Sequence, residues 1–185
     1  MPYIKTIEYE ESSGELREIY DNLIGSRGKL AEVHKIQSLN PAALLAHMEL
    51  YKATMFGRSP LKRYQREMMA VVVSAANKCP YCIAHHREAL LFYWKNEARV
   101  GQVADKFDMS NLTEADAALC HLARNLTLQP ASQPVAAIEQ LRRAGIEDRA
   151  ILDAVQVIAY FNFVNRMVLA LGVTFNEDEV KGYNY

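Results

Sequence analysis

Two cysteines and a histidine at short spacing are the residues of this chain best suited to chemistry. Cys79 and Cys82 form a Cys-x-x-Cys pair, and His86 follows the second cysteine by four residues. Residues three or four apart on a helix are neighbours, so the thiols can close a disulfide and the imidazole can exchange a proton with Cys82. We interpret the pair as a cycling dithiol with His86 as its proton partner; His85, three residues after Cys82, is a less well-placed competitor.

A proline places this pair at the start of a helix. If Cys79 caps the helix and Pro80 is its first residue, Cys82 is the third helical residue and both sulfurs lie in the first turn. The positive end of the helix dipole lowers the pKa of a thiol from about 8.5 toward neutrality. We therefore expect both thiols to ionise more readily than free cysteine does.

A glutamate on the preceding segment completes the motif. Glu67 lies twelve residues before Cys79, among Met68, Val71 and Val72. If the two helices cross closely, its carboxylate can face the cysteines from this apolar wall. Burial there would raise the pKa of Glu67 and suit it to proton relay. Residues 67–86 are thus the predicted redox motif.

The elements that must position these residues are helices. Apolar residues recur at helical spacing in segments that begin at caps or prolines and end near glycines. We expect helices within 12–25, 41–57, 59–78, 79–95, 111–128, 134–145 and 146–172, and a short helix or linker over 29–39. The prediction is an all-α, compact single-domain bundle of about seven or eight helices over residues 1–185, with 1–40 as an N-terminal helical extension.

Composition excludes several classes of function. The 185 residues are 50% hydrophobic and 23% charged, as in an ordinary globular domain. A net charge of -1, without a run of Lys and Arg, argues against a nucleic-acid partner. The start lacks the apolar stretch of a signal peptide, and polar residues at 162, 165 and 166 interrupt the most apolar segment. We therefore expect a cytoplasmic protein that does not span a membrane. In the reducing cytoplasm, a close cysteine pair is more often redox-active or metal-binding than structural.

The same residues carry a family resemblance. Glu67, the Cys-x-x-Cys pair twelve residues later and a histidine four residues after Cys82 resemble the AhpD alkylhydroperoxidase family, within the carboxymuconolactone decarboxylase-like superfamily. The sequence CPYCIAHH, together with FNFVNRMVLALG near the C-terminus, looks like the peroxidase-related branch of that family. The resemblance covers the chain from about residue 44 onward. It implies an AhpD-like helical subunit that assembles into a homo-oligomer, as a dimer, trimer or hexamer.

The resemblance also implies an activity. It suggests an antioxidant cysteine-based peroxidase, of peroxiredoxin type, that reduces hydrogen peroxide or organic hydroperoxides without a cofactor, haem or metal. Carried over, Cys82 would attack the peroxide, Cys79 would resolve the intermediate, and Glu67 with His86 would relay the proton. A lipoyl-type or thioredoxin-like dithiol would be the reductant. Tyr81 stands where AhpD has a histidine; it can donate a hydrogen bond, but a pKa near 10 makes it a poor base.

Two other interpretations stay open at this point. Zinc bound by the cysteines, His85 or His86 and a further ligand such as His121 would give a zinc-stabilised or redox-sensing interaction module, although no second ligand pair is visible. A carboxymuconolactone decarboxylase-like or other lactone-transforming enzyme would not need cycling thiols. Haem attachment is excluded because Ile83, not a histidine, follows the pair.

The remaining polar residues have less specific expectations. Cys120 lies on an apolar helix face and is expected to be a buried small hydrophobic residue rather than a redox residue. The lone histidines 34, 47 and 121 are expected to be surface or satisfied core residues. The last long segment is apolar all round, which predicts burial in the domain or between subunits. Asn162, Asn165 and Arg166 on that segment then require partners, around the cleft or across subunits.

Overall fold

Ten helices form the part of the chain that the structure describes, which is residues 2–132, 134–175 and 177–183 of a computed structural model. They are α1 (Gly14–Arg27), α2 (Glu32–Lys35), α3 (Pro41–Phe56), α4 (Arg63–Ala76), α5 (Pro80–Trp94), α6 (Glu97–Lys106), α7 (Glu114–Leu128), α8 (Pro134–Arg143), α9 (Asp148–Leu171) and α10 (Glu177–Val180). Eight of these have ten residues or more, and no strand occurs among the described residues. The all-α prediction is confirmed.

Local signals explain most of the helix boundaries. Asn40 caps α3 by accepting a hydrogen bond from the Ala43 N–H at 3.2 Å, and Thr113 caps α7 in the same way. Helix α6 was not predicted. Lys95 ends α5 in the left-handed conformation, with φ 50°, and Asn96 caps the next helix at once. Glycine is the usual residue in this conformation and lysine is rare there. The sequence therefore carries no glycine that would have marked the break between α5 and α6.

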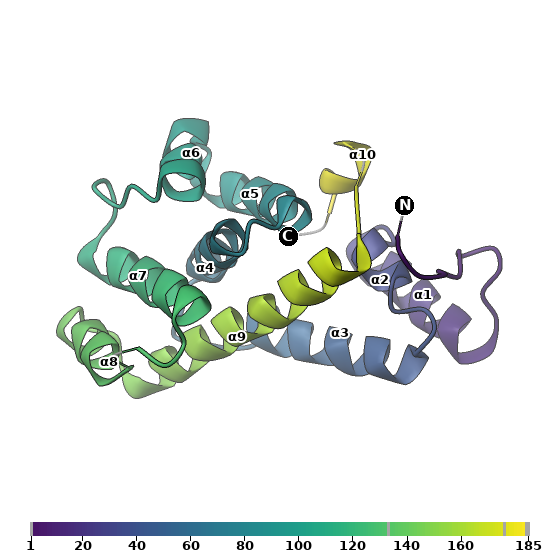
Figure 1. Cartoon of the computed structure of the whole chain (residues 1–185), viewed down its shortest axis with the longest axis horizontal. Coiled ribbons are helices and arrows are strands. Elements are labelled where there is room, and N and C mark those ends of the chain that lie inside the picture. Colours follow the sequence, from purple (N-terminus) through teal and green to yellow (C-terminus); the bar gives the residue numbers. More distant parts are fainter. Residues whose placement is uncertain (1, 133, 176, 184–185) are drawn as a thin grey trace.

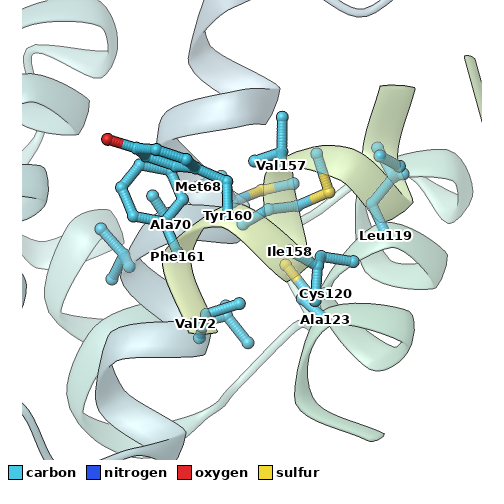
Figure 2. Packing of buried hydrophobic residues seen from close by; sticks show 14 of the residues in the cluster. Met68, Ala70, Val72, Leu119, Cys120, Ala123, Val157, Ile158, Tyr160 and Phe161 are labelled. Atoms are coloured by element: carbon cyan, nitrogen blue, oxygen red, sulfur yellow. The ribbon is translucent and has the colours of Figure 1, made fainter. Parts of the chain in front are cut away.

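Helices α4 and α9 form the centre of the single compact domain (Figure 1). Helix α9 crosses the molecule, with α4 and α7 on one side and α3 on another. Figure 2 shows Met68 and Val72 of α4 packed with Cys120 of α7 and Ile158 of α9. Cys120 is fully buried, and burial raises its pKa, so it behaves as a small hydrophobic residue, as predicted.

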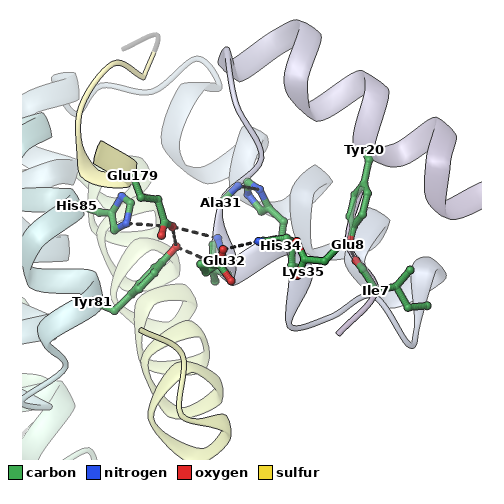
Figure 3. Close-up of polar contacts among 11 residues, drawn as sticks. Ile7, Glu8, Tyr20, Ala31, Glu32, His34, Lys35, Tyr81, His85 and Glu179 are labelled. Carbon is green, nitrogen blue, oxygen red and sulfur yellow. Dashed lines mark hydrogen bonds and ion pairs between the residues drawn. The ribbon is translucent and has the colours of Figure 1, made fainter. Parts of the chain in front are cut away.

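The N-terminal helix packs on a smaller cluster of its own. Apolar residues of α1, including Leu16 and Tyr20, contact Leu44 and Met48 of α3. The buried Tyr20 hydroxyl donates to the carbonyl of Ile7 at 2.9 Å (Figure 3). These contacts hold α1 beside α3, and Arg27 of α1 borders the cavity described below.

Helix α9 meets the length and composition of a membrane-spanning helix, with a mean hydropathy of 1.4 over an 18-residue window. We did not expect such a segment because polar residues interrupt it, yet its mean hydropathy over 18 residues is as high as that of a membrane-spanning helix. Of that window, 44% is buried within the fold. A core helix passes the same test, so the apolar character of α9 is explained by its central position.

Candidate active site

Both cysteines lie where the sequence analysis placed them. Cys79 is the N-cap of α5, Pro80 is its first residue, and Cys82 lies in the first turn. A tight connection after α4 makes this position possible, because Lys78 takes a left-handed φ of 56° and the Cys79 N–H bonds the Ser74 carbonyl at 3.0 Å. Both thiols are free and buried, with exposed fractions of 0% and 2%.

The two thiols do not ionise alike. The Cys82 thiol donates a hydrogen bond to the Cys79 sulfur and so lowers the pKa of Cys79; the N–H groups of Cys82 and Tyr81 add to the lowering. Sulfur is a weak acceptor, and no cap hydrogen bond of ordinary geometry forms. The pKa of Cys82 lies well above its usual value because of that hydrogen bond, burial and the adjacent Cys79 charge. A lowered pKa for both thiols was predicted, and Cys82 contradicts it.

Glu67 is fully buried and joined to the histidine of the motif. Its Oε2 lies 2.7 Å from His86 Nδ1, and its Oε1 accepts from Arg63 Nε at 3.1 Å. Burial alone raises the pKa of Glu67, but hydrogen bonds and charges of His86 and Arg63 outweigh burial and lower it. The expectation of a raised pKa was therefore wrong, because Arg63, one helical turn before Glu67, was not considered.

A cavity of about 90 Å³ brings these groups together. Glu67, Cys82 and His86 line one side of it, which we call the reactive wall, and Cys79 is not among the lining residues. A water molecule needs about 10–15 Å³ of such space, so the cavity accepts a small molecule. Substrate in this cavity would meet the Cys82 sulfur and not that of Cys79.

A second set of lining residues, which we call the facing wall, comes from distant segments. It includes His34 of α2, His47 and Tyr51 of α3, and Tyr160 of α9. His47 Nε2 lies 2.6 Å from the Tyr160 hydroxyl. Burial lowers the pKa of His34 to about 3 and that of His47 to about 4, so both are neutral at pH 7. The prediction of satisfied core residues holds for both, but their place beside the thiols was missed.

Tyr81 and His85 face a carboxylate from the C-terminal segment (Figure 3). The Tyr81 hydroxyl donates to Glu179 Oε1 at 2.6 Å and accepts from the Val33 N–H at 3.1 Å. Burial, then Glu179, raise the pKa of Tyr81 well above 10, so it is not a base. The His85 ring stacks on Tyr81 with centroids 4.5 Å apart, and its Nε2 lies 3.5 Å from Glu179. Burial lowers the pKa of His85.

The zinc interpretation finds no ligand set. Within the described ranges, no group of three or more His, Cys, Asp or Glu side chains could hold a metal ion. His121 is exposed on α7 and packs against Phe107 at 5.4 Å between ring centroids. It does not line the cavity that contains Cys82.

Comparisons with known proteins show which family and which folds the chain is similar to. Residues 41–105 match the model of the carboxymuconolactone decarboxylase family. The fold superimposes on a peroxidase-related protein from Silicibacter sp. TM1040 with a TM-score of 0.84 and 27% identity, covering 97% of this chain and 96% of that one. No match was found among curated proteins.

Two further solved structures share the fold. An AhpD-core, peroxidase-related protein from Ralstonia eutropha JMP134 gives a TM-score of 0.87 at 24% identity, covering 97% of this chain and 94% of that one. A cysteine-to-alanine variant of the debrominase Bmp8, in complex with 2,3,4-tribromopyrrole, gives 0.80 at 18% identity, with 98% and 100% covered. The family match over residues 41–105 and these likenesses support an AhpD-like fold of the carboxymuconolactone decarboxylase superfamily.

Proposed function

We propose that the protein is a cysteine-based peroxidase that reduces hydrogen peroxide or a small organic hydroperoxide. One observation carries the proposal: Cys82 faces a small cavity beside the Glu67–His86 pair, and Cys79 is hydrogen-bonded to it from behind. An attacking sulfur, a proton carrier and a resolving thiol are the groups that a dithiol peroxidase requires.

The proposed reaction has two steps. The Cys82 thiolate attacks one peroxide oxygen; an S–O bond forms, the O–O bond breaks, and the departing oxygen takes a proton from His86, giving a sulfenic acid and water or an alcohol. Cys79 then attacks the sulfenic sulfur, so that an S–S bond forms and water leaves. One peroxide is thus reduced and two thiols are oxidised. An external dithiol, lipoyl-type or thioredoxin-like, restores both thiols by exchange.

The Glu67–His86 pair supports the proton movements. Because Glu67 engages Nδ1, the other ring nitrogen is free of that contact and can take the proton from the Cys82 thiol. Glu67, kept ionised by its lowered pKa, stabilises the imidazolium that results. His86 can then return the proton to the departing oxygen.

Stopped-flow peroxide consumption by the reduced protein tests the proposal. Cys82→Ser is expected to abolish consumption. Cys79→Ser should consume one equivalent and stop at a sulfenic acid that dimedone traps, because no resolving thiol remains. Cys120→Ala, which alters the third and fully buried cysteine, should behave as the unaltered protein. Unchanged consumption in both motif variants would reject the mechanism.

A second candidate is thiol-dependent reductive dehalogenation of an aromatic compound. The cavity is rich in aromatic rings, with Tyr51, Tyr81, Tyr160 and Phe161 among its lining residues, and the debrominase shares the fold. Two thiols would supply two electrons, replacing the carbon–bromine bond by carbon–hydrogen and releasing bromide and a proton as the disulfide forms. Bromide release from 2,3,4-tribromopyrrole, without peroxide consumption, would favour this candidate. Turnover of a lactone that survives alkylation of the thiols would favour the decarboxylase-like alternative.

We also propose that the protein is a cytoplasmic homo-oligomer that associates through α3 and α9. Leu45, Leu50, Leu152, Phe163 and Leu169 on these two helices are each 42–52% exposed. Exposed large apolar side chains of this kind are typical of an interface when a partner covers them. Light scattering at micromolar concentration should show a multiple of 21.0 kDa, and Phe163→Glu should shift it to the single-chain mass. Val135→Glu on α8 is the control; a single-chain mass for the unaltered protein contradicts the proposal.

A further inference from the structure

A buried polar chain lies behind the thiols, outside the cavity. Asn165 of α9 is fully buried, and Asn77 ends α4 two residues before Cys79. Asn162 and Arg166 continue the chain along α9 to the surface, where Arg166 is exposed. Neither Asn165 nor Asn77 lines the cavity. The proton movements proposed for the Glu67–His86 pair do not require these residues, so their role is still to be assigned.

Donors from both ends of this chain converge on the side-chain oxygen of Asn162. Arg166 can only donate, and its Nη1 bonds Asn162 Oδ1 at 2.7 Å, which fixes that atom as an acceptor. Asn77 Nδ2 donates to the same oxygen at 3.0 Å and to Asn165 Oδ1 at 3.2 Å. Because the oxygen of Asn165 is used in this way, its Nδ2 must face the other side.

That other side holds the reacting sulfur. Asn165 Nδ2 lies 3.4 Å from Ser74 Oγ, which places this fully buried amide group at the end of α4 beside the cysteine pair. The hydrogen bond of Cys82 with Cys79, burial and the Cys79 charge raise the pKa of Cys82, and the Asn165 side chain acts against them by favouring the thiolate. The arginine at the surface therefore orients, through two asparagines, an N–H donor toward Cys82. A donor to a thiolate stabilises the charged form, whereas a protonated thiol gains little from it.

We propose that Asn165 is a further catalytic residue, which holds the Cys82 sulfur as a hydrogen-bond acceptor facing the cavity, and that Asn77, Asn162 and Arg166 are its positioning residues. The inference deepens the proposed function, since it concerns the same attacking thiolate. The two cysteine thiolates would then be stabilised by different donors. Backbone N–H groups donate to the Cys79 sulfur, and the side-chain amide of Asn165 donates to the Cys82 sulfur.

The test measures ionisation of Cys82 alone, in a Cys79→Ser, Cys120→Ala background. Thiolate absorbance near 240 nm and the rate of iodoacetamide alkylation are followed against pH. Asn165→Leu should raise the pKa of Cys82 by about one unit, a tenfold loss of thiolate at a given pH below it. Asn165→Asp, which has nearly the same shape but replaces the donor by an acceptor, should raise it further.

Two variants separate this role from packing. Thr127→Val removes the hydroxyl that accepts from Asn162 at 3.0 Å but leaves the donors toward Cys82 in place, so the Cys82 pKa should not change. Arg166→Met alters an exposed side chain, will not disturb the core, and should raise the pKa by a few tenths of a unit. An unshifted pKa in the Asn165 variants overturns the inference; if these do not fold, an unshifted pKa in Arg166→Met does so.

The readout is independent of the substrate. If the pKa of Cys82 shifts as expected but the protein consumes no peroxide, the inference stands and the proposed function fails. If peroxide is consumed and the pKa of Cys82 does not depend on Asn165, only the inference is overturned.

Discussion

The two walls of the cavity are built in different ways. The reactive wall takes Glu67, Cys82 and His86 from two consecutive helices, within a span of 20 residues. The facing wall takes His34, His47 and Tyr160 from three helices, and the hydrogen bond between the last two joins residues 113 apart in sequence. The first wall concentrates charge beside the sulfur, and the second presents neutral rings.

Under the proposed function, this difference would separate chemistry from recognition. The Glu67–His86 pair next to Cys82 can move protons, while histidines with a pKa of about 3 or 4 stay uncharged and act through hydrogen bonds and shape. Two groups of the same type, His86 and His47, thus receive different tasks from their neighbours. Variants that affect only one wall should therefore change different measurable quantities.

The largest effect is expected at the reactive wall. Glu67→Gln removes the negative charge that stabilises protonated His86, so the rate of peroxide consumption should fall about 10²-fold or more. Stopped-flow kinetics measure it. Glu179→Gln alters another buried carboxylate that bonds Tyr81 rather than His86, and its rate should stay within a few-fold. Equal losses in both variants would show that burial of a carboxylate, not the link to His86, matters.

The facing wall should dominate the pH dependence of stability. His47 has a pKa of about 4 when folded and about 6.5 when unfolded, so the unfolded chain binds more protons between these values. The free energy of unfolding is therefore fully present above pH 6.5 and falls as the pH drops toward 4, by about 3 kcal/mol from this residue. Urea unfolding from pH 4 to 7 measures the slope, to which His34 contributes in the same direction. His47→Gln should flatten it; an unchanged slope contradicts the assignment.

A smaller effect is expected from the tyrosine of the facing wall. Tyr160→Phe keeps the ring and removes the hydroxyl that lies 2.6 Å from His47. The KM for an organic hydroperoxide should rise about three- to tenfold, since one hydrogen bond of recognition is weakened, and kcat should change little. Steady-state kinetics with a coupled dithiol reductant separate the two constants. A loss confined to kcat would move Tyr160 into the chemical step.

The same contrast explains what could be predicted from the sequence. Caps, prolines and helical spacing are local, so the position of Cys79 and Cys82 in the first turn of α5 was correctly predicted. The facing wall depends on contacts between distant segments, which no local pattern reports. The predicted direction of the Glu67 pKa shift was wrong because the hydrogen bonds and charges of His86 and Arg63 outweigh burial. The hydrogen bond between Tyr81 and Glu179 joins residues 98 apart, which local sequence patterns do not report. A tyrosine in place of the family histidine was the one sequence signal for that bond.

In the proposed peroxidase cycle, the buried hydrogen bonds around Cys79 would affect regeneration of the dithiol. An incoming reductant that enters through the cavity meets only the Cys82 side of the disulfide. Its attack there expels Cys79, and thiol exchange is faster when the expelled sulfur has a low pKa. Because the N–H groups of Tyr81 and Cys82 lower the pKa of Cys79, this sulfur is a good leaving group. The low pKa of Cys79 would thus set the rate at which an external dithiol reduces the Cys79–Cys82 disulfide.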